Sequence, residues 1–135
     1  MADLLESQSP QPQRLCASAD LQEGALAVPF DVLDVDEADA EAFPIRAFAI
    51  RFEGNVHAYL NRCNHVAMEM DWQPNRFFDD SGQWLLCASH GAAYLPDSGA
   101  CAGGPCQGGL VKIPVSETGG QVHWYPVPGI APLRF

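Results

Sequence analysis

The chain has 135 residues, of which 47% are hydrophobic and 18% are charged, as in an ordinary globular protein. This length suits one domain with a sizeable core and excludes a catalytic domain beside a separate cofactor module. The formal net charge of −10 argues against a nucleic-acid-binding surface, which must neutralise phosphates. It favours a partner protein with a basic docking surface, although the alternative is that the acidic residues only keep the protein soluble.

The first twenty residues differ in composition from the rest. Residues 1–20 are rich in Gln, Ser and Pro and have no periodic apolar pattern, which predicts a mobile N-terminal arm before a domain at 21–135. The start of the chain contains acidic residues and no apolar run of signal-peptide length, and no later run is long enough to span a membrane. We therefore expect a cytoplasmic protein that does not contact a membrane.

Short strands are expected from residue 21 onward. Apolar residues alternate over 45–52, a turn follows at 53–55, and a return strand begins at Val56, so this region is a predicted hairpin. Just before it, residues 35–43 form the one helix candidate, which Pro44 would end.

Two further hairpins are predicted later in the chain. The first spans residues 75–89 and turns at 80–82, and the second spans 109–127 with Gly119-Gly120 as its turn. Twelve glycines and eleven prolines fit the many tight connections that such hairpins need. The sequence therefore predicts an all-β domain, an antiparallel sandwich of short strands.

Two cysteine–histidine pairs follow predicted strands. Cys63 and His65 form a C-x-H pair, and Cys87 and His90 form a C-x-x-H pair after 21 intervening residues. A structural zinc ion would take all four ligands, whereas a two-iron cluster can take two thiolates on one iron and two imidazoles on the other. In the second case each loop must reach both irons, so the very short spacings favour the cluster over zinc.

The two pairs resemble the cluster-binding boxes of Rieske iron–sulfur proteins, C-x-H and C-x-x-H-G-x-x-[YF]. The run at 99–108 resembles the Gly/Pro loop that closes over the cluster in that family, and the likeness covers about residues 21–127. It implies a Rieske-type sandwich in which two Cys/His hairpin loops form a cluster-binding subdomain. It also implies one [2Fe-2S] cluster per chain.

The resemblance implies roles for the four ligands. Cys63 and Cys87 would bind the inner, buried iron through their thiolates. His65 and His90 would bind the outer iron near the surface, where electrons would enter and leave.

Four further residues match positions that surround the cluster in the family. Gly91 would let the backbone approach the cluster, and Tyr94 occupies an aromatic position that can donate a hydrogen bond toward a ligand sulfur. Gly104 and Pro105 would form the covering loop.

Three positions depart from the boxes of quinol-oxidising Rieske subunits. Where those subunits carry an extra cysteine in each box and a serine after the second histidine, this chain has Met68, Ser89 and Ala92. The resemblance thus implies that a disulfide and a sulfur-directed hydrogen bond are missing. Because such hydrogen bonds stabilise the reduced cluster, we expect a reduction potential toward the low end of the Rieske range of about −150 to +300 mV.

The remaining cysteines need a separate interpretation. Cys101 and Cys106 flank four small residues on the expected covering loop and are close enough in sequence for a disulfide if their Cβ vectors meet. We favour small buried thiols that shield the cluster. Cys16 is interpreted as a free thiol.

Two functions fit these features. The first is an electron carrier without substrate chemistry, which passes single electrons between a reductase and a terminal oxygenase or reductase. The alternative is a permanently docked small Rieske subunit, similar to that of assimilatory nitrite reductase, which would copurify with its partner. A Rieske oxygenase domain is disfavoured because the sequence shows no second domain for a mononuclear iron.

Overall fold

The computed structural model describes residues 11–24, 26–35, 42–62, 70–71, 75–79, 81–87, 91–104, 108–127 and 129–132. Within these ranges the chain forms eleven strands and one 3-10 turn, η1 (Ser18–Asp20). The same ranges contain no helix that is both long and apolar enough to cross a membrane.

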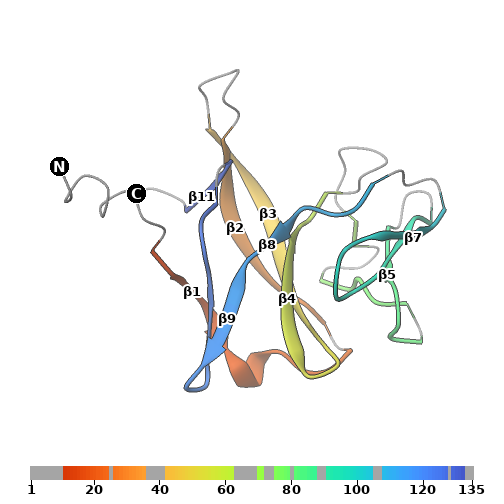
Figure 1. Ribbon diagram of the computed structural model, residues 1–135, viewed down its shortest axis with the longest axis horizontal. Helices are drawn as coiled ribbons and strands as arrows, with labels where there is room; N and C mark the ends of the chain where they lie inside the picture. Colours follow the sequence, from red (N-terminus) through yellow and green to blue (C-terminus); the bar gives the residue numbers. More distant parts are fainter. Residues whose placement is uncertain are drawn as a thin grey trace.

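The strands form three antiparallel sheets. The first has the order β1-β10-β9, with bounds Gln13–Ala17, Gln121–Trp124 and Val115–Thr118. The second has the order β11-β2-β3-β4-β8, with bounds Ile130–Ala131, Val28–Val35, Ala42–Phe52, Asn55–Leu60 and Lys112–Ile113. The third has the order β5-β6-β7, with bounds Leu85–Leu86, Ala93–Tyr94 and Cys101–Gly103. The third sheet lies to one side of the other two (Figure 1), and the predicted all-β fold is confirmed.

Strand β3 is buried on both faces, because its apolar residues alternate. Phe48 and Ile50 face the core that contains the third sheet, whereas Ala47 and Ala49 face a second core beneath β10. Phe48 stacks on Phe77, which precedes β5, with ring centroids 3.7 Å apart. The predicted hairpin at this strand is confirmed, since β3 pairs with β4 across a two-residue turn.

A second set of contacts fastens the third sheet to β4. The hydroxyl of Tyr59 donates a 2.7 Å hydrogen bond to the carbonyl of Pro96, and burial raises the pKa of that hydroxyl. Lys112 donates to the carbonyl of Asp97 in the same loop. Gly99 lies so close to the Tyr59 ring that a Cβ there would be 2.7 Å from a ring carbon. The β6–β7 turn is therefore held against the large sheet.

The last predicted hairpin is confirmed, whereas the predicted helix is wrong at both of its ends. Strands β9 and β10 pair across Gly119-Gly120. Val35 belongs to β2 and pairs with Ala42 at the start of β3, and residues 36–41 lie outside the described residues. Pairing between two long strands thus overrides the helix propensity of the acidic, alanine-rich segment.

The N-terminal boundary also differs from the expected one. Residues 13–17 form β1, in which Cys16 pairs with Val122 of β10 and is 5% exposed. These residues belong to the first sheet, although the sequence predicted an arm over 1–20. Residues 1–10 lie outside the described residues.

Arg51 in β3 makes an ion pair whose pH dependence can be tested. Its guanidinium donates to both carboxylate oxygens of Glu117 in β9, at 3.1 and 2.5 Å. This hydrogen bonding lowers the pKa of Glu117 below its ordinary value of 4.5. The stabilisation is therefore present above pH 4.5 and is lost as the pH falls through the lower, folded-state pKa.

We expect Glu117→Gln to lower the free energy of unfolding by about 1 kcal/mol at pH 7, because this pair is partly exposed to solvent. The difference in free energy of unfolding between the variant and the native protein should shrink as the pH falls from 4.5 through the folded-state pKa of Glu117. Thermal unfolding of both proteins between neutral and acidic pH measures it. A difference in stability that stays constant down to low pH would show that the ion pair does not stabilise the fold.

Candidate metal centre

Cys87, the cysteine of the C-x-x-H pair, lies at the start of the turn that connects β5 to β6. The backbone N–H of Cys87 donates to the carbonyl of Ala92 at 2.8 Å, and the N–H of Gly91 donates to the carbonyl of Cys87 at 3.0 Å. Gly91 has a φ of +73°, a left-handed conformation that favours glycine, and a Cβ there would meet no described atom within 4 Å. The left-handed backbone conformation of this turn is therefore a sufficient reason for a glycine at position 91. His90 lies outside the described residues.

The environment of the Cys87 thiol is apolar and closed to solvent. Cys87 is 1% exposed and shares a core with Leu85, Ala92 and Tyr94, all of which are fully buried. Such surroundings disfavour an isolated thiolate. A positively charged metal bound to the sulfur would reverse that preference, because it holds a coordinating thiol in its deprotonated form.

Gly104 brings the chain after β7 into close contact with the same turn. Its φ is +81°, and a Cβ there would lie 2.9 Å from both the Cα of Ala92 and the carbonyl oxygen of Gly91. Both contacts are with backbone atoms, so a larger residue could not be accommodated by a side-chain rotation. The predicted covering-loop residue Gly104 thus lies directly against the Cys87 turn, whereas Pro105 lies outside the described residues.

The C-x-H pair lies in residues 63–69, which are outside the described residues. The residues on both sides of this segment are described. Asn61 is 3% exposed and Met70 is fully buried in the core that also contains Cys87. Met70, the residue directly after the segment that carries Cys63 and His65, is therefore packed in the same core as Cys87. Among the described residues alone, no three Cys, His, Asp or Glu side chains are grouped as a metal site.

The interpretation of Cys101 as a buried thiol is wrong. Cys101 is disulfide-bonded and half-buried in β7, opposite Tyr94. Cys16 and Cys87 keep their thiols, so the partner of Cys101 lies outside the described residues, as does Cys106. Whether two cysteines can be bridged depends on the approach of their Cβ atoms, which spacing alone does not fix.

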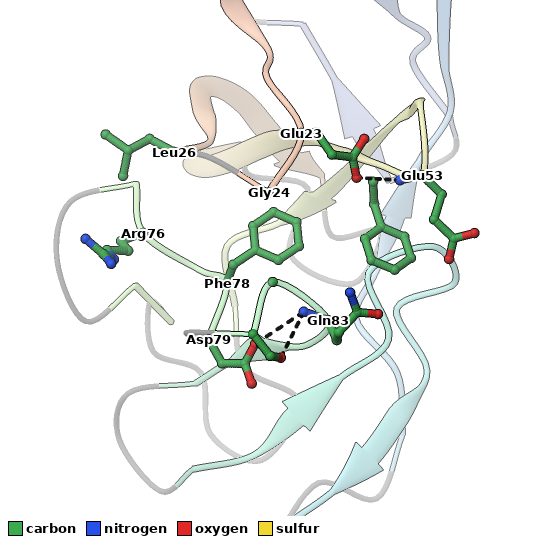
Figure 2. Close-up of a pocket in the computed structure, with 11 residues that line it drawn as sticks. Glu23, Gly24, Leu26, Glu53, Arg76, Phe78, Asp79 and Gln83 are labelled. Atoms are coloured by element: carbon green, nitrogen blue, oxygen red, sulfur yellow. Dashed lines mark hydrogen bonds between the residues drawn. The ribbon is translucent and has the colours of Figure 1, made fainter.

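A cavity of about 660 Å³ is lined in part by residues that precede β5, whereas Cys87 follows β5 (Figure 2). Phe78 points into it, and Glu23 and Asp79 are among the other residues that line it. Both carboxylates accept backbone hydrogen bonds, including one from the N–H of Gln83 to Asp79. Since Gln83 precedes β5 and Cys87 follows it, the cavity is separate from the candidate metal centre.

Sequence reasoning missed the network beside the first pair. The side chain of Asn61 accepts a hydrogen bond from the N–H of Met70 at 2.7 Å and donates one to Asp71 at 3.0 Å. The available signal was a polar residue directly after the apolar run that ends in Leu60.

The model of the Rieske [2Fe-2S] domain family matches residues 11–115 of this chain. The chain belongs to the Rieske [2Fe-2S] domain family. Its cofactor is accordingly a single [2Fe-2S] cluster. The described residues of this Rieske domain fit such a group. The solvent-inaccessible thiol of Cys87 lies in the same turn that the backbone of Gly104 contacts closely.

Solved structures share the Rieske fold at low sequence identity. The ferredoxin of carbazole 1,9a-dioxygenase from Nocardioides aromaticivorans IC177 is 19% identical, with a TM-score of 0.65 over 87% of this chain and 99% of that one. A ferredoxin from Sphingomonas yanoikuyae B1 is 20% identical, with a TM-score of 0.61 over 87% and 100% of the two chains. The terminal oxygenase of carbazole 1,9a-dioxygenase from Novosphingobium sp. KA1 is 23% identical, with a TM-score of 0.61 over 86% of this chain and 29% of the oxygenase. Among curated proteins, none matches this Rieske-domain chain by sequence.

Proposed function

We propose that this Rieske-domain protein is a one-electron carrier between a reductase and a terminal oxygenase or reductase, with no substrate chemistry of its own. The observation that carries the proposal is the buried thiol of Cys87 at the closed turn of the second box. Cys63 and Cys87 supply the thiolate ligands, and His65 and His90 supply the imidazoles. When bound, the cluster takes up and releases one electron at a time.

The structural neighbours support a carrier. The match to this chain covers 99% of one ferredoxin and 100% of the other. A further neighbour, with a TM-score of 0.60 and 22% identity, is a complex of reduced oxygenase and oxidized ferredoxin in carbazole 1,9a-dioxygenase. That complex shows the class of partner with which a ferredoxin of this fold can associate.

The charge of the chain supports a basic docking surface on the partner. With a formal net charge of −10, the protein would be steered toward positive surfaces at low ionic strength. Asp31 in β2 is an exposed acid, and its ion pair with Arg46 is long, at 3.8 Å. An ion pair that is so exposed contributes little, so Asp31 remains available to a partner. A cytoplasmic location stays a prediction.

Electron paramagnetic resonance of the protein, purified without air and reduced with dithionite, tests the proposed function. We expect a rhombic signal with a low average g value, two irons per chain and little zinc, because two imidazoles replace two thiolates on one iron. A redox titration should give a potential toward the low end of about −150 to +300 mV. Zinc in place of iron, without a signal, would instead show a structural zinc module.

The size of the purified protein separates the carrier from the permanently docked subunit. A carrier should elute as a chain without a bound partner, since transient redox contacts are weak. Stable copurification with a larger oxidoreductase would favour the nitrite-reductase-like alternative.

A further inference from the structure

Asn61 is the one buried residue with an amide, carboxylate or basic side chain in the part of the chain that the structure describes. It directly follows β4 and precedes the segment 63–69, which carries Cys63 and His65. A buried amide that lacked partners would cost about 1–3 kcal/mol. Its contacts therefore show what it stabilises.

The side chain of Asn61 joins the two ends of the segment 63–69. Its Oδ1 accepts a hydrogen bond from the backbone N–H of Met70 at 2.7 Å, and its Nδ2 donates to Oδ1 of Asp71 at 3.0 Å. The amide can only be oriented in this way, because an N–H faces one side and a carboxylate faces the other. The backbone N–H of Asn61 also donates to the carbonyl of Arg46 in β3, at 2.8 Å.

Asp71 continues this connection toward the sandwich. Its second oxygen, Oδ2, accepts the backbone N–H of Asn75 at 2.9 Å, and the carbonyl of Asn75 accepts the N–H of Ala27 at 2.8 Å. Ala27 immediately precedes β2. The chain after the segment is thus attached to the large sheet from one side by Asn61 and from the other by Asn75.

We propose that Asn61 and Asp71 are positioning residues that hold Cys63 and His65 in register with Cys87. The inference rests on the proposed function, since it takes Cys63 and His65 as cluster ligands. Fixing the ends of the segment reduces the conformations open to the chain between them. Four ligands on two irons must be held within a narrow range of geometry, so a looser segment releases its ligands more readily.

The two side chains can be exchanged to test this pairing. Asn61→Asp places a carboxylate against the carboxylate of Asp71 and removes the amide donor. The double variant Asn61→Asp/Asp71→Asn restores every bond. The carboxylate at 61 then accepts from Met70 and from the amide at 71, whose oxygen still accepts the N–H of Asn75.

We expect the single variant Asn61→Asp to release iron to a chelator about tenfold faster than the native protein and to broaden its paramagnetic signal. Asp71→Asn, which introduces no charge repulsion, should show a smaller increase and serves if the first variant does not fold. The double variant should return to within about twofold of the native rate. Val122→Ala, in the buried part of β10 and in the other core, should lower the melting temperature but raise the rate of iron release far less than Asn61→Asp does.

The outcomes separate this inference from the ligand assignment. If the native protein holds no [2Fe-2S] cluster, the proposed function has failed and the inference is overturned with it. If the native protein is fully loaded and both single variants release iron at its rate, the positioning role alone is overturned. A double variant that releases iron as fast as Asn61→Asp would overturn the pairing of the two side chains.

Discussion

Replacing Cys87 with alanine should leave the purified protein without its cluster. This thiol is 1% exposed, and the proposed function makes it one of two sulfur ligands of the buried iron. The described residues of the core around it, among them Leu85, Ala92 and Tyr94, include no other free thiol that could replace it as a ligand. Iron content and the visible absorption of the purified variant measure the loss.

Cys16 provides the matched control for this experiment. It is also a buried thiol, 5% exposed, but it lies in the other core and pairs with β10. Cys16→Ala should cost about 1 kcal/mol of stability and keep two irons per chain. If both alanine variants keep the native iron content, Cys87 is not a ligand.

Gly104→Ala should destabilise the protein much more than Gly54→Ala. The two glycines have nearly equal φ values, +81° and +82°, so alanine meets the same left-handed strain of about 1–2 kcal/mol at each position. Only at Gly104 would the new Cβ lie 2.9 Å from backbone atoms of the Cys87 turn. Overpacking of this kind adds about 1–3 kcal/mol, because backbone segments must move apart.

Thermal unfolding and the rate of iron release from both variants check this expectation. At Gly54 the Cβ would meet no described atom within 4 Å, so Gly54→Ala should change stability modestly and leave iron release unchanged. Gly104→Ala should show both a larger loss of stability and faster iron release. Equal effects at the two positions would mean that the close approach of Gly104 has no role in covering the centre.

Local signals predicted a large part of this fold. The alternation over 45–52 and the glycine turn at 119–120 each determine a hairpin from neighbouring residues, and both hairpins are present. The segment 35–43 was misread because its acidic and alanine residues favour a helix in isolation, whereas pairing between β2 and β3 depends on residues outside it. Strand β1 was missed for a similar reason, since its partner β10 lies at the other end of the chain.

The candidate site shows the same division. The Cys/His spacing is local and specific, and it indicated the family that the domain match later showed. The disulfide of Cys101 and the hydrogen bonds of Asn61 depend on how distant segments approach one another. Residue types alone did not determine either of them.

The double burial of β3 couples the metal-binding end of the molecule to its far end. Phe48 and Ile50 contribute to the core of Cys87, whereas Ala47 and Ala49 contribute to the core of Cys16. The chain therefore cannot release one side of this strand without exposing apolar surface on the other. The two halves should behave as a single foldon, with one melting transition. Losing the cofactor would then weaken even the strands that never approach it.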